Sequence, residues 1–322
     1  DGELGVAEAS LRAWTTRNED IYDGLSAFIN MSRYQSQLTA YNRLEVELES
    51  LKETLDLRAA GGVSDRSEIL RINISLQELR RDMVTTTASL QQSHTDLVRF
   101  LPDGINYSPL QSIANASAVC SRSWTDSEPP LDALARVTVS RMIIAEELTR
   151  AQRLPRIILN AGAATTSAVA SATPGVSLNL DASDMLGLDG NSRVEAAALD
   201  SGAAVAAYEA QRAKTLAELE RLEQKYNGYL SSLRQLETLQ PINNDTLDLY
   251  REQLDVGSIS LIEGISIFRE ITDTEIEISN FHADIIINCL QSSQFRGTLA
   301  PFLSYDSKVL QPEIFEVSVT AQ

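Results

Sequence analysis

The chain has 322 residues, of which 43% are hydrophobic and 6% aromatic, so it is long enough to bury a core and to form two or three domains. Its formal net charge is −18 and no cluster of Lys and Arg stands out, which argues against nucleic acid as a partner. The acidic balance indicates either the solubility of an exposed protein or an interior that attracts cations. No apolar run approaches the roughly 20 residues of a membrane-spanning helix, so any contact with a bilayer would be made by strands.

Two long helices are predicted in residues 1–104. In the first, apolar residues recur at steps of three and four, the spacing of a coiled-coil seam: Tyr34, Leu38, Tyr41, Leu44, Leu48, Leu51 and Leu55. Gly61 and Gly62 interrupt this pattern, and a second helix is expected from about Arg66 to Leu101. The pair predicts a long antiparallel hairpin.

The middle of the chain changes character twice. Residues 105–154 are expected to form an irregular equatorial segment and a shorter amphipathic helix from Leu131 to Arg153. Residues 155–188 place apolar residues at alternate positions, which predicts a β-hairpin with its turn at Thr173-Pro174-Gly175. The weak alternation suits a membrane barrel, although an aromatic girdle is missing. A flexible linker rich in Ala and Ser is the alternative.

A second helical hairpin is predicted over residues 189–290, followed by a tail over 291–322. Its first helix is expected to run from Asp189 to about Leu239, to kink or break at Pro241, and to resume to Leu254. After a turn at Gly257, the last helix is expected over residues 260–290.

The two hairpins indicate an internal duplication. Gly2 and Gly190 open them, and Gly62 and Gly257 mark their tips. The spacings are 60 residues (62 − 2) and 67 residues (257 − 190), and the difference of seven is close to two helical turns. An arm of this size would be about 90 Å long. Because each hairpin has only a narrow apolar seam, we expect an oligomer with cyclic symmetry.

The stretch from Tyr250 to Glu263 resembles the second hairpin tip of the TolC-like outer-membrane efflux proteins. In that motif a helix ends in Gly, and a short turn with a small or polar residue and an acidic residue precedes an apolar pair. Residues 55–70 are similar. The order of helix, Pro155, strand hairpin and Asp189-Gly190 also resembles this family, and the similarity extends to about Leu290.

The resemblance implies a mainly α fold with a small β part, in which duplicated antiparallel α-helical hairpins form a coiled-coil tunnel and β-strands join a trimeric outer-membrane barrel. It implies a homotrimer in the outer membrane of a Gram-negative bacterium, with a large periplasmic part. The expected function is a passive export duct of a tripartite efflux pump or a type I secretion system.

The partners implied are outer-membrane lipid, a periplasmic adaptor (membrane fusion protein) that opens the tip, and an inner-membrane pump or ABC transporter. No catalysis, cofactor or metal is expected. A periplasmic adaptor or a coiled-coil scaffold is the alternative function. An adaptor would hold one hairpin inside a lipoyl-like β domain, however, and a scaffold would lack strands between its helices.

The chain departs from the family pattern in two places. A family protomer contributes two strand hairpins, so we expect a further N-terminal segment before Asp1. Leu254 and Ile259 stand where well-known members carry aromatic and basic latch residues.

The resemblance places Glu68 and Glu263 near the closed end, where they imply a channel constriction that attracts cations. Ordinary carboxylates at helix starts are the alternative. The residues expected to contact the adaptor are those of the two tips: Gly62, Val63, Ser64, Gly257 and Ser258.

The cysteines and histidines do not predict a metal site or a catalytic base. Cys120 and Cys289 lie far apart and each follows a long helical block, which leaves open a disulfide or two inert buried thiols. His94 and His282 have no carboxylate or cysteine at ligand spacing. The sequence has no nucleophile elbow, P-loop or dinucleotide fingerprint.

Overall fold

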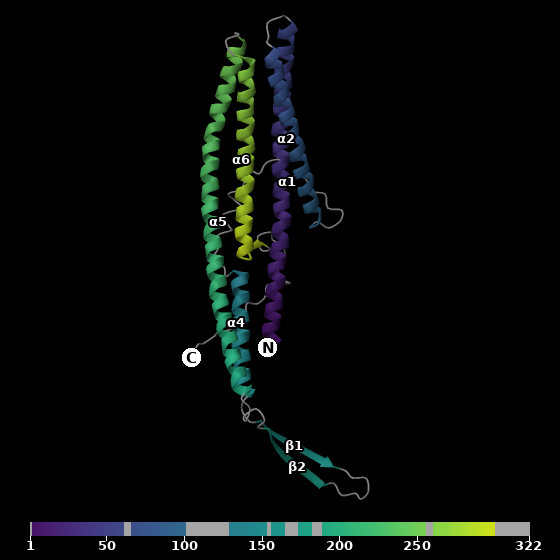
Figure 1. Ribbon diagram of the computed structural model, residues 1–322, viewed down its shortest axis with the longest axis vertical. Coiled ribbons are helices and arrows are strands. Elements are labelled where there is room, and N and C mark those ends of the chain that lie inside the picture. The colour runs from purple at the N-terminus through teal and green to yellow at the C-terminus, as the bar shows by residue number, and fades with distance from the viewer. Residues whose placement is uncertain are drawn as a thin grey trace. The chain divides into compact units, whose positions relative to one another are not determined.

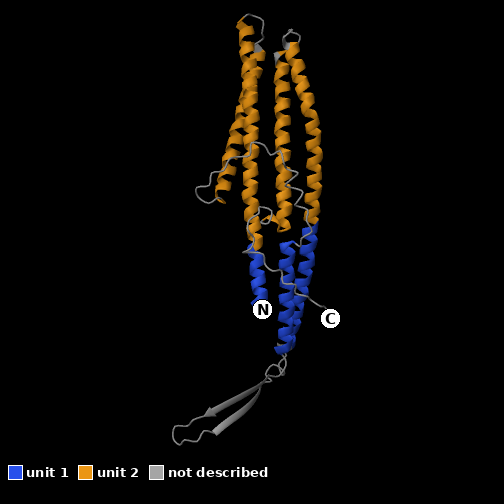
Figure 2. Cartoon of the chain, turned by 180° about the vertical axis from the view of Figure 1, so that it is seen from behind, with its two compact units in different colours: residues 1–13, 128–216, 310–322 blue, residues 14–127, 217–309 orange. Residues whose placement is uncertain are grey.

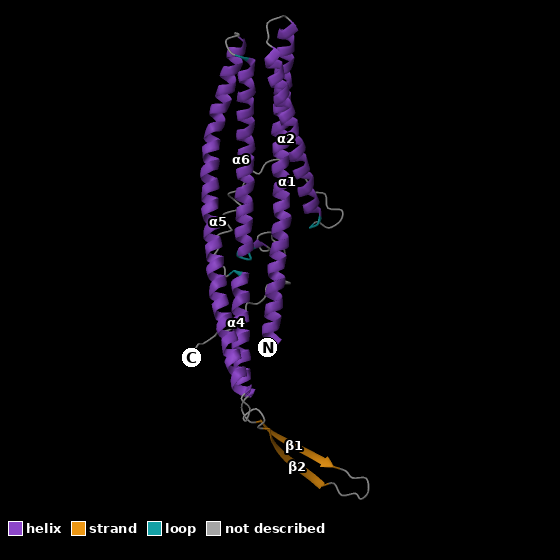
Figure 3. Cartoon of the chain, in the orientation of Figure 1, coloured by secondary structure: helices purple, strands orange, loops and turns teal. Residues whose placement is uncertain are grey.

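The computed structural model describes residues 2–60, 66–100, 129–152, 156–164, 173–181, 189–255 and 260–299, and these are mainly helical with a small β part (Figures 1 and 3). The elements are α1 (Gly2–Ala60), α2 (Arg66–Val98), α4 (Pro130–Gln152), β1 (Arg156–Ala164), β2 (Thr173–Asp181), α5 (Asp189–Asp255) and α6 (Leu261–Phe295). At 1.5 Å per residue, the 59 residues of α1 extend about 90 Å, as predicted.

The chain forms two compact units (Figure 2). Unit 1 comprises residues 1–13, 128–216 and 310–322, and unit 2 comprises residues 14–127 and 217–309. Both α1 and α5 contribute residues to each unit. The five segments predicted from the sequence stay a prediction.

Unit 2 contains two antiparallel hairpins, α1 with α2 and α5 with α6. Arg80 on α2 reaches back to Glu45 and Glu49 on α1, and Tyr229 on α5 packs against Phe281 on α6 with ring centroids 5.9 Å apart. Part of the coiled-coil seam predicted for the first helix is buried, namely Leu44, Leu48, Leu51 and Leu55, whereas Tyr34, Leu38 and Tyr41 are half-buried.

Among the described residues, three apolar clusters hold unit 2 together. One of them joins both hairpins near the helix ends, and we call it the tip core: Leu44, Leu48, Leu51, Leu55, Ile72, Leu76, Leu79, Tyr250, Ile265 and Phe268. A second cluster, around Ile29 and Cys289, joins α1, α5 and α6. A small third cluster, with Ala27, Met31 and Leu97, closes α1 on α2.

In unit 1, α4 is fixed by polar contacts to the beginnings of α1 and α5. The guanidinium of Arg141 pairs with Glu8 at 2.9 Å. The hydroxyl of Thr215 donates to Asp132 at 2.8 Å, and both side chains are buried.

The strands of unit 1 pair antiparallel from Arg156↔Asp181 to Ala164↔Thr173. A β-hairpin was therefore predicted correctly, and the linker alternative does not hold for these residues. The predicted turn at residues 173–175 is wrong, because these residues lie in β2, where Pro174 pairs with Ala163 at the end of a two-stranded sheet. An edge position tolerates the missing N–H of proline.

A kink or a break was predicted at Pro241, and the break is wrong, because α5 continues through this residue to Asp255. Packing outweighs local preference here: the amide of Asn243 donates to Thr274 on α6 at 3.0 Å. Cys289 lies within α6, which continues beyond the predicted end at residue 290 to Phe295. Among the described helices, none combines the length and hydropathy needed to cross a membrane.

Candidate functional site at the hairpin tips

The ends of four helices meet at one end of unit 2: the C-terminal ends of α1 and α5 and the N-terminal ends of α2 and α6 (Figures 1 and 2). Ser260 caps α6, and its hydroxyl accepts a hydrogen bond from the backbone N of Ile262 at 3.2 Å. Such a cap satisfies one of the free N–H groups at a helix start. The start of α6 is therefore well defined by its sequence.

Glu68 and Glu263 occupy corresponding places, each in the first turn of the second helix of its hairpin. Glu68 is half-buried and Glu263 is exposed. Both carboxylates gain from the positive end of a helix dipole. Both residues can therefore be explained as ordinary carboxylates at helix starts. Their role in a channel constriction stays a prediction.

The other predicted site residues divide between described and undescribed parts of the chain. Cys120 lies outside the described residues. So do the residues of the two tip turns, which are Gly62, Val63, Ser64, Gly257 and Ser258. Cys289 is fully buried and its sulfur is part of a disulfide. Its pairing with Cys120 stays a prediction.

The two histidines lie on different helices, His94 on α2 and His282 on α6. His94 is exposed, whereas His282 is half-buried, and burial lowers its pKa although Glu237 acts in the opposite direction. Within the described residues, no group of three or more His, Cys, Asp or Glu side chains is placed to hold a metal ion.

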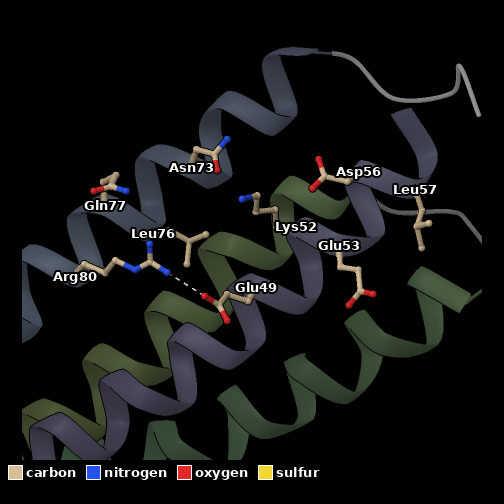
Figure 4. Close-up of a pocket in the computed structure, with 9 residues that line it drawn as sticks. All are labelled: Glu49, Lys52, Glu53, Asp56, Leu57, Asn73, Leu76, Gln77 and Arg80. Carbon is tan, nitrogen blue, oxygen red and sulfur yellow. Dashed lines mark hydrogen bonds and ion pairs between the residues drawn. The ribbon is translucent and has the colours of Figure 1, made fainter. Parts of the chain in front are cut away.

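A groove of about 520 Å³ lies between α1 and α2 just behind the tip (Figure 4). Its wall on α1 carries most of the charge, and its wall on α2 is mainly polar. The lining residues are Glu49, Lys52, Glu53, Asp56, Leu57, Asn73, Leu76, Gln77 and Arg80.

Arg80 closes the inner end of this groove. Its Nε donates to Glu45 at 2.8 Å and its Nη2 to Glu49 at 2.9 Å. These carboxylates, Glu45 first, raise the pKa of Arg80, so the side chain is a permanent cation that is already engaged. Glu53 and Asp56 remain in the groove with the single ammonium of Lys52, and the outer part of the groove is acidic.

Beneath the groove, the tip core joins the two hairpins. Tyr250 of α5 is 2% exposed and meets Phe268 of α6 edge-on, with centroids 6.1 Å apart and an interplanar angle of 81°. This is a favourable geometry for an aromatic pair. Leu48 and Leu55 of α1 lie fully buried in the same cluster.

Polar contacts continue the joint between α1 and α6 away from the tip, and we call them the polar ladder. They are Arg33–Asp284, Gln37–Asn280 at 2.8 Å and Arg43–Glu275 at 2.6 Å. The number on α6 falls as the number on α1 rises, so these two helices run antiparallel. The ladder fixes one hairpin to the other.

Arg269 of α6 makes the contact with α2: its Nη2 donates to Glu78 at 2.7 Å and to the carbonyl of Ser75 at 3.1 Å. One turn further along α6, burial raises the pKa of Asp273, as do Glu277 and Asp82, while Arg269 acts against them. The hairpins therefore meet through both attractive and repulsive charges.

Sequence reasoning missed the charged residues that join one helix to another. It did not predict which neighbouring helix Arg80 or Arg269 would contact, because the rotation of one helix relative to another depends on tertiary packing. Tyr250 and Gly264 did carry a signal: each lies seven residues from the tip glycine (257 − 250 and 264 − 257). Residues equally far from a turn face each other in an antiparallel hairpin.

The fold of this chain, with two long helical hairpins separated by a strand hairpin, is similar to the folds of several solved outer-membrane proteins. One similar structure is a membrane protein from Pseudomonas aeruginosa, with a TM-score of 0.75 at 18% identity over 92% of this chain and 71% of that chain. The outer membrane protein VceC from Vibrio cholerae has a TM-score of 0.77 at 12% identity over 92% and 74%. The MtrE outer membrane channel of Neisseria gonorrhoeae, in its open state, has a TM-score of 0.73 at 14% identity over 92% and 70%.

The resemblance predicted from the tip motifs is thus confirmed at the level of the fold. The sequence matches no protein-family model and no curated protein.

Proposed function

We propose that this chain forms the outer-membrane channel of a tripartite efflux pump or a type I secretion system, acting as a passive duct without covalent chemistry. The observation that carries the proposal is the likeness in fold to outer-membrane channels over 92% of the chain. The strand hairpin of unit 1 supports it, because such a hairpin from each copy would contribute to a barrel in outer-membrane lipid.

A homotrimer is part of the proposal, and the outer faces of the helices support self-association. On α2, three large apolar residues are exposed: Leu70, Ile74 and Val84. They are four and ten residues apart, so they lie within a quarter turn of the helix circumference and share one face. Leu239, Ile242 and Leu249 of α5 are exposed as well. Neighbouring copies would bury these side chains and close a tunnel of helices.

The tip end of unit 2 is the proposed contact for the periplasmic adaptor, which would link the duct to an inner-membrane pump or ABC transporter. The acidic outer part of the groove between α1 and α2 suits a basic helical partner, because opposite charges steer encounter. Rigid-body movement of the hairpins would then open the tunnel.

Particle symmetry tests the proposed duct. The protein is extracted from outer membranes in detergent and imaged by negative-stain electron microscopy. We expect rods with three-fold symmetry and a length of about 100 Å or more, as helices of this size require. Compact or two-fold particles would contradict the trimeric tunnel.

The proposed constriction makes a separate prediction. Glu68→Gln combined with Glu263→Gln should lower the cation-over-anion permeability ratio of the channel in planar bilayers severalfold, because three copies of each carboxylate lose their charge. Glu220→Gln combined with Glu223→Gln is the control, since it removes as many carboxylates from exposed positions away from the tip. Equal selectivity in both double variants would remove Glu68 and Glu263 from the constriction.

A further inference from the structure

Tyr250 lies where the two hairpins meet, and its environment is unusual for a tyrosine. The side chain is 2% exposed and belongs to the tip core, to which α1, α2, α5 and α6 all contribute apolar residues. Among the described residues, its hydroxyl has no hydrogen-bond partner. Buried tyrosine hydroxyls usually find one, because an unpaired polar group loses its hydration without compensation.

The end of the Tyr250 ring fills the space that a side chain at position 264 would need. A Cβ built on Gly264 would lie 2.2 Å from the hydroxyl oxygen and 2.5 Å from Cζ, distances that real side chains do not show. The tyrosine and the glycine are therefore complementary. Any larger residue at position 264 requires the Tyr250 ring to move.

The hydroxyl also remains neutral in this setting. Burial raises the pKa of Tyr250, with Glu263 acting in the same direction and Arg58 against it. A neutral hydroxyl can both donate and accept, and water would satisfy it as soon as the surrounding helices separated. The packed arrangement thus gains the burial of the ring and loses the hydrogen bonds of its hydroxyl.

We propose that Tyr250 is the positioning residue that sets the balance between a packed and a parted arrangement of the two hairpin tips. Its ring, seated against Gly264, fixes how closely α5 approaches α6 and the first hairpin. Its unpaired hydroxyl disfavours the packed arrangement and makes parting easier. The inference rests on the proposed function where it relates the parting of the tips to the opening of a duct.

Hydrogen exchange of the protein in detergent tests the balance between the packed and the parted arrangement. The exchange rates are measured at the backbone amides of residues 262–270 and 44–58. We expect Tyr250→Phe to slow exchange there about tenfold, since it removes the unsatisfied group and keeps the ring. Gly264→Ala should speed it, because the new methyl displaces the ring. Tyr229→Phe is the matched control, a half-buried tyrosine of α5 in another cluster, and should leave these amides unchanged.

A double variant guards against simple misfolding of Gly264→Ala. Leucine at position 250 is shorter than tyrosine, so Tyr250→Leu combined with Gly264→Ala should recover slow exchange. Unchanged or faster exchange in Tyr250→Phe would overturn the inference, as would a double variant no slower than Gly264→Ala.

Single-channel recording separates this inference from the proposed function. If Tyr250→Phe also opens less often than the parent protein, the tyrosine acts on the duct as inferred. Slowed exchange in a protein that forms no channel would retain the role of Tyr250 in packing and overturn the proposed duct.

Discussion

Leu48→Ala should lower the free energy of unfolding of unit 2 by about 3 kcal/mol, the usual cost of removing a fully buried leucine side chain. Leu48 is 0% exposed and lies in the tip core, between residues of both hairpins. The loss combines the transfer of apolar atoms to water with the cavity that remains. Urea denaturation followed by far-UV circular dichroism gives the shift in midpoint.

The same helix offers a matched control for this substitution. Leu57 is 70% exposed, so Leu57→Ala is expected to change the stability by no more than about 0.5 kcal/mol. Equal midpoint shifts in the two variants would show that the tip core does not hold the hairpins together.

Asp284→Ala should cost unit 2 about 2 kcal/mol, because it leaves the charge of Arg33 unpaired in a place poorly reached by water. The Arg33 side chain is 16% exposed, and its Nε is buried with no hydrogen-bond partner in the part of the chain that the structure describes. Since Asp284 itself is partly exposed, the expected cost lies below that of breaking a fully buried pair. Thermal unfolding at low and high salt measures the loss.

Asp248 provides the control for this second substitution. It pairs with Arg251 at 3.8 Å and its side chain is 75% exposed, so Asp248→Ala should have little effect. An Asp284→Ala variant as stable as Asp248→Ala would mean that the polar ladder contributes orientation alone and no net stability.

The long helices could be predicted from the sequence because their apolar spacing is local. The leucines at positions 44, 48, 51 and 55 were assigned to a seam and are buried in the tip core. The errors came from giving proline too much weight. Pro241 remains within α5 and Pro174 within β2, since contacts to neighbouring elements outweigh the local preference.

The contacts between the hairpins could not be predicted in the same way. The repeat indicated two hairpins but not which faces meet, because helix rotation depends on side-chain packing. Arg269 with Glu78 is such a case: 191 residues separate the partners, and neither belongs to a recognisable motif. The candidate groove likewise depends on the spacing of α1 and α2, which sequence periodicity does not specify.

The polar ladder has a mechanical consequence for the two hairpins. Its rungs differ in chemistry, so sliding α6 along α1 by one turn either way would place Arg33 opposite Asn280 or Asn288 and leave it without its carboxylate. The apolar tip core sets no comparable register, because one leucine contact can replace another. We therefore expect the polar ladder to oppose sliding of α6 along α1 more strongly than the tip core does.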